Sequence, residues 1–524
     1  MSPCHKSTKI RLFLTCWLIF VVHFATDFVR EHYLVLSITE DHSFKLDKYM
    51  GLNPDIFMTD DHGAHHGANP GASMIAAIPY FVFKPLVNWI DNLYSNRSRE
   101  SNKEMTAIYK DYRAPRVKFY KKVRERGWDI KFGLVSLITM VFCMAPLSAL
   151  SAVFMYHLLS KLGYSTRWPI WLALLYALGT PIFFRTGYLN QNVMVGIFGF
   201  IGFVQLWEMG ERKEEKNTKR YVFAGFLGGL TLLCDYSGLV PLIMLYGYGL
   251  LRRMDTVPIQ QAIRESFWYL AGAIGPIMLL GFYQWQSFGN PFYPGQHYMP
   301  PVPWIDIGYR GVGLFSKELL WMLLFDLRFG LFVISPILLL AFIAPFLNYL
   351  KKSIVPFRET LFIIFFFVTL SLLFSGIQYT RLQWVTGIRY MVPVIPFLFI
   401  LTSVVLIRMP RFISYGLILI SFGGSWAISM VRRGVGVPEE SMLASVWSVL
   451  FEGLQLPWLT TVSKMASQYM PFLEGEAKSP LPLFVILSLI IYGIWNIQFS
   501  WKIRRREKVH ISDQKETVGK HVGE

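Results

Sequence analysis

The sequence predicts an all-α polytopic membrane protein with about twelve transmembrane helices. Its 524 residues are 53% hydrophobic and only 16% charged. Long runs such as 12–25, 331–347 and 361–374 contain no charged residue. Because backbone polar groups in hydrocarbon must be paired within their own segment, such runs are expected to cross the bilayer as helices. A soluble domain would instead carry apolar residues on one face of each helix only.

Twelve apolar segments are the expected spans. They lie near 10–25, 132–158, 168–184, 193–207, 222–234, 239–251, 267–283, 331–347, 361–374, 391–407, 413–430 and 481–495. Residues 74–90 are apolar as well, but Pro79, Lys84 and Pro85 interrupt them. A crossing there would also place several basic segments on the wrong side of the membrane. We therefore expect 74–90 to be interfacial or re-entrant.

Lysine and arginine gather beside the spans and set the expected orientation. The net charge is +17, and the basic residues concentrate in 211–220, 251–253, 351–352, 408–411 and 502–508. This is the positive-inside pattern of a multi-pass protein of the cell (inner) membrane, and it requires no nucleic acid as a partner. Both termini are expected in the cytoplasm, with the first apolar segment acting as an uncleaved signal-anchor.

With this orientation, four polar segments share the extracytoplasmic side. They are 27–131, 185–192, 284–328 and 376–390, and the first is a long loop that is expected to carry interfacial helices. Asp235 and Tyr236 interrupt a long apolar run and reach the same side. A carboxylate at such a break suggests a pocket that faces a ligand. A functional site is therefore expected at the outer face.

The first outer loop concentrates residues that can carry chemistry. It holds Asp60 and Asp61 with His62, His65 and His66, set among Gly, Ala and Ser. Such residues are costly in a membrane protein unless they face water and handle something polar. His65 and His66, with His62, are candidates to bind a divalent metal together with Asp61, because imidazole and carboxylate are common metal ligands. This metal is the one cofactor that the residues suggest.

Six short segments, in a fixed order over about residues 10–410, resemble a known family. They are 69–73 with 75–79, 175–188, 230–238, 288–292, 328–331 with Ser335 and Pro336, and 384–396. The last contains Gly387, Arg389 and Tyr390 and is similar to a Gly-x-Arg-Tyr-x-x-Pro-x-x-Pro segment of bacterial members. Together the segments resemble the GT-C class of membrane glycosyltransferases, relatives of the protein O-mannosyltransferases and aminoarabinose-lipid A transferases.

The resemblance implies an enzyme that moves a hexosyl or pentosyl group from a polyprenyl-phosphate-linked sugar to an acceptor at the extracytoplasmic face. The implied partners are this donor, membrane lipid, and an acceptor that is protein, lipid or polysaccharide. A carboxylate acts as general base on the acceptor hydroxyl, and cations stabilise the departing phosphate. We expect contacts to the donor phosphate or the substrate from Arg389, Tyr390, Asp235, Tyr236 and Arg185, since arginine suits phosphate.

Four carboxylates are candidates for the general base. In much of the GT-C class, an Asp-Glu pair follows the first span with a Tyr close behind. Here Asp27 and Glu31 are separated from each other. The base is therefore one of Asp61, Asp60, Glu31 and Asp27, and the setting among His and Gly favours Asp61 and Asp60.

The expected domains follow the spans and the resemblance. Residues 1–430 form a GT-C-like transmembrane catalytic domain that includes loop 27–131. Residues 431–501 form an extracytoplasmic segment and the last transmembrane helix, and residues 502–524 form a basic and polar cytoplasmic tail. The domain prediction thus assigns all the candidate site residues to one unit.

The alternative function is a transporter or flippase of a lipid-linked or amphipathic substrate. It predicts ionisable residues within the spans and two similar halves of the chain. Most ionisable residues lie instead at span ends or in loops, which favours the enzyme. A non-catalytic relative that binds lipid-linked glycan is a third hypothesis.

Overall fold

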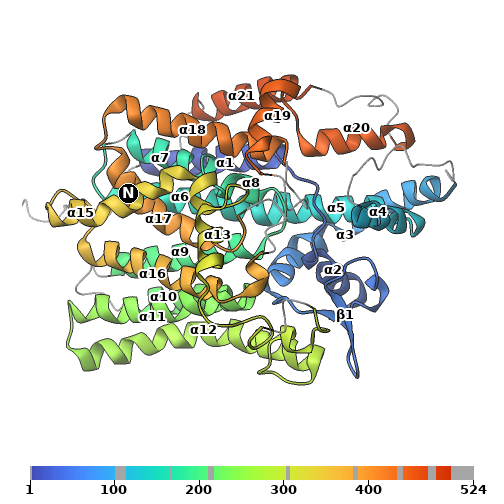
Figure 1. Ribbon diagram of the computed structural model, residues 1–524, viewed down its shortest axis with the longest axis horizontal. Helices are drawn as coiled ribbons and strands as arrows, with labels where there is room; N and C mark the ends of the chain where they lie inside the picture. The colour runs from blue at the N-terminus through green and yellow to red at the C-terminus, as the bar shows by residue number, and fades with distance from the viewer. Residues whose placement is uncertain are drawn as a thin grey trace, which may run out of the picture.

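The computed structural model describes residues 3–100, 114–165, 167–209, 218–302, 307–381, 388–432, 441–469 and 479–496. The predicted tail 502–524, basic residues 211–217 and residues 384–387 of the family-like segment lie outside this set. The described chain is mostly helical, which confirms the predicted helical character, and its strands form one small hairpin. Most of the long helices run roughly along the long axis of the molecule (Figure 1).

Helix α9 (Gln191–Met209) lies at the centre of this bundle. Almost all of its side chains are buried, whichever side they face. It packs against α6 (Ala145–Lys161), α10 (Thr218–Cys234), α11 (Leu239–Met254) and α17 (Ile395–Leu406). A helix that is apolar all round is expected only in the interior of a large protein or a membrane. Its first residues reach the candidate site, so the core of the bundle positions that site.

Glycines bring neighbouring helices into close contact. Helix α12 (Ile259–Phe288) packs against α10, and a Cβ at Gly225 of α10 would lie only 1.8 Å from the Tyr269 carbonyl oxygen. A Cβ at Gly196 of α9 would lie 2.9 Å from the Cα of Pro393. Small residues allow helix backbones to approach in this way. The contact at Gly196 holds the segment after Arg389 directly against α9.

A charged cluster holds the other end of α9. Glu208 is 7% exposed, and its carboxylate lies 2.7 Å from the Lys161 Nζ and 2.9 Å from the Arg220 Nη1. His157 Nε2 lies 2.5 Å from the same carboxylate. The cluster ties α6, α9 and α10 together at the end far from Gln191.

The remaining helices surround this centre. Before α9 are α1 (Pro3–Val22), α5 (Asp129–Thr139), a π-helical turn η4 (Met140–Met144), α7 (Trp168–Leu178) and α8 (Ile182–Thr186). After α12 are α13 (Lys317–Phe325), α14 (Leu331–Ile334), η7 (Pro336–Ile343), α15 (Ala344–Tyr349), α16 (Phe357–Ser375), α18 (Arg411–Met430), α19 (Ala444–Glu452), α20 (Pro457–Tyr469) and α21 (Leu481–Asn496). Short 3-10 turns η5 (Tyr236–Gly238), η6 (Gly295–Tyr298), η8 (Gln378–Arg381) and η9 (Val392–Val394) join them.

Five helical segments of the described chain are long and apolar enough to cross a membrane. They are Gly71–Leu93, Asp129–Lys161, Ile259–Phe288, Phe357–Ser375 and Arg411–Met430. Shorter apolar helices cover Trp168–Leu178, Pro336–Tyr349, Val392–Leu406 and Leu481–Asn496. These segments support membrane character, whereas the number of about twelve spans stays a prediction.

The prediction that prolines interrupt 74–90 is wrong. Helix α3 (Gly71–Glu100) continues through both Pro79 and Pro85. A proline removes one backbone hydrogen bond and tends to kink a helix, but packing on either side can hold the helix together. Tyr80 and Val87 supply such packing, because both are almost fully buried on one face of α3. The segment Gly71–Leu93 meets the length and composition of a span.

The first predicted outer loop is ordered around a short hairpin. Helix α2 (Glu31–Leu36) continues into the π-helical turn η1 (Ser37–Asp41) and is followed by the 3-10 turn η2 (Asp47–Tyr49). Strand β1 (Ile56–Thr59) pairs antiparallel with β2 (Gly63–His66), and α4 (Ala114–Glu125) precedes α5. Figure 1 shows α2 and β1 at the same end of the molecule.

Candidate functional site

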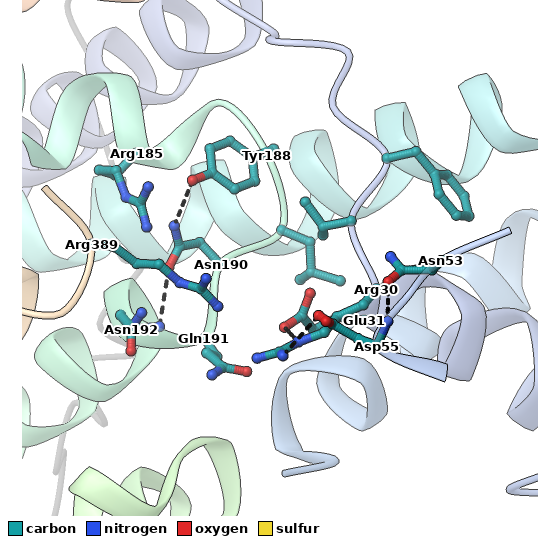
Figure 2. A pocket seen from close by; sticks show the side chains of 13 residues that line it. Arg30, Glu31, Asn53, Asp55, Arg185, Tyr188, Asn190, Gln191, Asn192 and Arg389 are labelled. Atoms are coloured by element: carbon teal, nitrogen blue, oxygen red, sulfur yellow. Dashed lines mark hydrogen bonds and ion pairs between the residues drawn. The ribbon is translucent and has the colours of Figure 1, made fainter. Parts of the chain in front are cut away.

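A polar cavity lies where the start of α2 meets the start of α9. Its volume is about 170 Å³. Its walls come from three distant parts of the chain: Phe28, Val29, Arg30, Glu31, Asn53 and Asp55; Arg185, Tyr188, Leu189, Asn190, Gln191 and Asn192; and Arg389. Figure 2 shows Arg30, Glu31, Asn53 and Asp55 on the right, and Arg185, Arg389 and the amides of residues 190–192 on the left.

Glu31 is the buried carboxylate of this cavity. It is 5% exposed, and Arg30 Nε donates to its Oε1 at 3.1 Å. Arg30 also binds the partly exposed Asp55 at 3.1 Å. Burial alone would raise the pKa of Glu31, but the charges of Arg30 and Arg389 outweigh it and hold that pKa below its usual range. Glu31 therefore stays ionised at neutral pH.

The position of Glu31 is fixed by the hairpin loop and α3. Ser73, in the first turn of α3, donates its hydroxyl to the Glu31 carbonyl oxygen at 2.8 Å. Asn69 donates to the Leu232 carbonyl oxygen at 2.7 Å, which ties the same loop to the end of α10. The Pro-Gly segment thus supports the cavity from behind.

Arg185 and Arg389 bring positive charge to the opposite wall. Arg185 is 1% exposed, and its guanidinium lies 5.4 Å from the centre of the Tyr188 ring. Burial lowers the pKa of Arg185 to about 10, and the nearby charges of Arg389 and Arg432 act in the same direction. Arg389 stacks over Tyr390 at 5.2 Å. Two like charges held near each other favour an anionic ligand.

The N-terminus of α9 completes this wall. Asn190 caps the helix, because its Oδ1 accepts from the backbone N–H groups of Asn192 at 3.1 Å and Val193 at 3.3 Å. Its Nδ2 donates to the Tyr188 hydroxyl at 3.2 Å. The positive end of the α9 dipole therefore faces the cavity and adds to the attraction for an anion.

Asp235 and Tyr236 stand behind the cavity rather than in its wall. Asp235 Oδ2 accepts from Gln191 Nε2 at 2.6 Å, and its Oδ1 accepts from the backbone N–H and hydroxyl of Ser237 at 2.9 and 2.7 Å. The Tyr236 hydroxyl accepts from Gln284 Nε2 at 2.7 Å. Asp235 thus both caps the 3-10 turn η5 and orients Gln191.

Asp27 is buried beside the same region in an ion pair. It is 8% exposed, and its Oδ2 lies 3.0 Å from Arg432 Nη1. The Arg432 guanidinium stacks on the ring of Tyr188, a residue of the cavity wall, at 5.0 Å from the ring centre. Asp27 does not line the cavity.

Asp60 and Asp61 lie away from the cavity. They form the turn of the hairpin, next to the paired residues Thr59 and Gly63, and both are exposed. Gly63 adopts φ +84°, which suits glycine in a tight turn. The structure therefore brings Glu31, Arg185 and Arg389 together and leaves Asp60 and Asp61 outside this group.

His65 and His66 point to different partners. His65 shares a hydrogen bond of 2.9 Å with the His62 carbonyl oxygen, and His66 Nδ1 accepts from the Ala68 N–H at 3.2 Å. Burial lowers the pKa of His66 to about 4, and Arg30 adds to the effect. Among the described residues, no three His, Cys, Asp or Glu side chains come together as metal ligands.

Several cavity residues were not singled out from the sequence. They are Arg30, Asp55, Tyr188 and the consecutive amides Asn190, Gln191 and Asn192. Three amides at the head of an apolar span were a usable signal, because such groups need partners at that depth. Asp55 had no such signal, since its place depends on the hairpin fold.

The chain was also compared with known proteins. No family model, no curated protein and no solved structure matches it.

Proposed function

We propose that this protein is a GT-C-like membrane glycosyltransferase that takes a sugar from a polyprenyl-phosphate donor. One observation carries the proposal: Glu31 and the pair Arg185 and Arg389, more than 150 residues from it in the chain, line one cavity. A carboxylate on one wall and cations on the other are the two groups that the transfer needs. The site takes up the acceptor hydroxyl beside Glu31 and the donor phosphate beside the arginines.

The reaction follows from this division. The Glu31 carboxylate accepts the proton of the acceptor hydroxyl as its oxygen forms a bond to the anomeric carbon. The bond between that carbon and the phosphate oxygen breaks, and its electron pair leaves with the lipid phosphate. Arg185, Arg389 and the α9 N-terminus stabilise the charge that develops there.

Binding of the donor phosphate also changes the pKa of Glu31. The lowered pKa of Glu31 makes it a weak base while Arg30 and Arg389 face it alone. A phosphate beside Arg389 offsets part of that positive charge, so the pKa of Glu31 rises towards the value useful for proton abstraction. Catalysis is thereby coupled to the presence of the donor.

The membrane arrangement belongs to the same proposal. The cavity end of the molecule faces the extracytoplasmic side of the cell membrane, the Glu208 end faces the cytoplasm, and about twelve helices cross the bilayer. Support comes from α9 itself, whose residues between Asn192 and Glu208 carry no charge. The acceptor is protein, lipid or polysaccharide.

The deciding experiment compares carboxylate variants in proteoliposomes. Release of polyprenyl phosphate from polyprenyl-phosphate sugars is measured with membrane extract as the source of acceptor. Glu31→Gln should lower the rate at least about 100-fold, whereas Asp61→Asn and Asp60→Asn should stay within about twofold. Full activity of Glu31→Gln, or sugar-lipid crossing the bilayer without transfer, would refute the proposal.

A further inference from the structure

Two amide side chains at the head of α9 line the cavity without full pairing. Asn192 is 1% exposed and Gln191 is 5% exposed. Within the described part of the chain, neither Nδ2 nor Oδ1 of Asn192 has a hydrogen-bond partner, nor does Oε1 of Gln191. Buried polar groups are normally paired, and an unpaired one is costly. These atoms therefore point to a ligand.

The orientation of Gln191 is set from behind. Its Nε2 donates to Asp235 Oδ2 at 2.6 Å, because a carboxylate accepts and does not donate when ionised. This fixes Oε1 as an acceptor on the cavity side. Asp235 is itself held by Ser237, so the arrangement is rigid.

These atoms suit hydroxyl groups better than phosphate. Phosphate oxygens only accept hydrogen bonds, so Gln191 Oε1 would repel them, whereas the arginines supply the donors that they need. A hydroxyl both donates and accepts. The acceptor on Gln191 and the donor and acceptor on Asn192 therefore match the hydroxyls of a sugar ring.

The charges that line the cavity and the cavity volume limit the kinds of sugar that can bind. Arg30, Arg185 and Arg389 line the cavity, while the carboxylates of Glu31 and Asp235 are already engaged at 3.1 and 2.6 Å, which disfavours an ammonium group. A uronate carboxylate would face the Gln191 acceptor. The cavity of about 170 Å³ is smaller than the roughly 300–1,000 Å³ of sites for larger ligands, so it suits one ring.

We propose that Asn192 and Gln191 form a subsite for the hydroxyls of a single neutral monosaccharide, a hexose or pentose without an amino group. The subsite rests on the proposed function, because the sugar is the one carried by the lipid phosphate. The phosphate lies on the arginines and the sugar ring on the amides. Asp235 acts as a positioning residue for Gln191.

The test compares lipid phosphate with and without sugar. Dissociation constants are measured in detergent by intrinsic tryptophan fluorescence for bare polyprenyl phosphate, for a panel of neutral hexose and pentose conjugates, and for a 4-amino-pentose conjugate. The wild type should bind at least one neutral conjugate about tenfold more tightly than the bare lipid, and the amino conjugate no more tightly than the bare lipid.

The isosteric variants Asn192→Leu and Gln191→Met should each lose about tenfold for the neutral conjugate. Their affinity for bare polyprenyl phosphate should be unchanged. Gln205→Met, on α9 but outside the cavity, is the matched control and should behave as wild type. Asn192→Leu removes no described side-chain hydrogen bond, so its melting temperature should not fall.

The outcomes separate the two proposals. If the wild type binds bare lipid and all conjugates equally, or if Asn192→Leu keeps the preference for sugar, the subsite is refuted while the glycosyltransferase proposal stands. A preference for the amino conjugate also refutes the subsite. If the wild type binds neither lipid phosphate nor any conjugate, both proposals fail.

Discussion

At the scale of single residues, the cavity holds opposite charges in separate places. Glu31 contacts Arg30 at 3.1 Å, while Arg185 and Arg389 lie on the far wall. A buried carboxylate is costly unless cations and hydrogen bonds compensate it. The positive charges of Arg30 and Arg389 therefore stabilise the ionised form of Glu31 in the protein without ligand.

Replacing Arg389 with Gln should weaken both donor binding and transfer. A charge-assisted contact to the leaving phosphate is lost, so kcat/KM should fall by about 10- to 1,000-fold. The control is Arg381→Gln, because Arg381 pairs with Glu318 in an exposed position outside the cavity. Steady-state kinetics in proteoliposomes measure both, and equal rates for the two variants would contradict the role of Arg389.

The acid limb of the pH profile should lie below the usual pKa of a glutamate. Because the pKa of Glu31 is lowered, the base is ionised across the neutral range and kcat/KM falls only as the pH drops through the shifted value. Burial lowers the pKa of His66, the histidine whose charge acts on Glu31, to about 4, so we expect no step near pH 6.5 from this residue. A kcat/KM profile tests this, and an acid midpoint near 6.5 would contradict it.

The free energy of unfolding should change with pH in the same direction as kcat/KM, falling as the solution becomes more acidic. A carboxyl with a lowered folded pKa adds stability that is present above its unfolded pKa and is lost as the pH falls through the folded value. Arg389→Gln removes one of the charges that lower the pKa of Glu31. The acid limb of the kcat/KM profile of this variant should therefore move to higher pH. An unchanged acid limb would mean that Arg389 and Glu31 do not interact.

The residues of the site were only partly predictable from the sequence. Arg185 and Arg389 followed from the family-like segments, and Glu31 from its place after the first span. Asp60 and Asp61 were favoured because of their neighbours in the chain, but a hairpin turn carries them outwards. Local composition does not reveal which way a turn faces, and that depends on the pairing of β1 with β2.

At the scale of elements, the sequence indicated where helices lie better than where they stop. Each predicted span overlaps a helix, because apolar length is read directly from the sequence. The prolines of α3 were misread, since the packing of Tyr80 and Val87 that holds the helix together comes from distant elements. Tertiary contacts thus overrode a local signal.

The contact between α10 and α12 should depend on single glycines. A Cβ at Gly225 would lie 1.8 Å from the Tyr269 carbonyl oxygen, and one at Gly272 would lie 2.0 Å from the Val222 carbonyl oxygen. Gly225→Ala and Gly272→Ala should each lower the free energy of unfolding by about 1–3 kcal/mol. The control is Gly275→Ala on the same helix, where the added methyl meets open space.

Helix propensity alone predicts that a Gly→Ala substitution raises the free energy of unfolding instead of lowering it. Alanine is favoured over glycine inside a helix by about 1 kcal/mol, so Gly275→Ala should be neutral or stabilising. Melting temperatures of the purified protein in detergent distinguish the cases. Equal shifts for Gly225→Ala and Gly275→Ala would mean that the backbones are not in contact at Gly225.

At the scale of the whole molecule, polar clusters mark the two ends of an apolar core. Gln191 and Glu208 are 17 residues apart on α9, which corresponds to about 25 Å of helix. That length is close to the hydrocarbon thickness of a bilayer, about 30 Å. The cavity and the Glu208 cluster are therefore expected near opposite membrane surfaces.

Cysteine labelling in intact cells tests this orientation. In a Cys4→Ser background, Asp60→Cys at the hairpin turn should react with a membrane-impermeant maleimide. Gln260→Cys, exposed near the start of α12, should react only after the cells are opened. The native Cys16, Cys143 and Cys234 are buried and should stay silent. Labelling of Gln260→Cys in closed cells would invert the proposed topology.

The ion pair between Asp27 and Arg432 joins the beginning of the chain to a segment made much later. Trp458 strengthens this junction, because its indole N–H donates to the Val22 carbonyl oxygen at 2.9 Å. The two charged residues are 405 positions apart, and at about 5–20 residues per second a ribosome needs roughly 20–80 s to pass from one to the other. During that interval Asp27 lacks its ion-pair partner, so the Asp27–Arg432 contact beside Tyr188 forms only after the later segment has been synthesised.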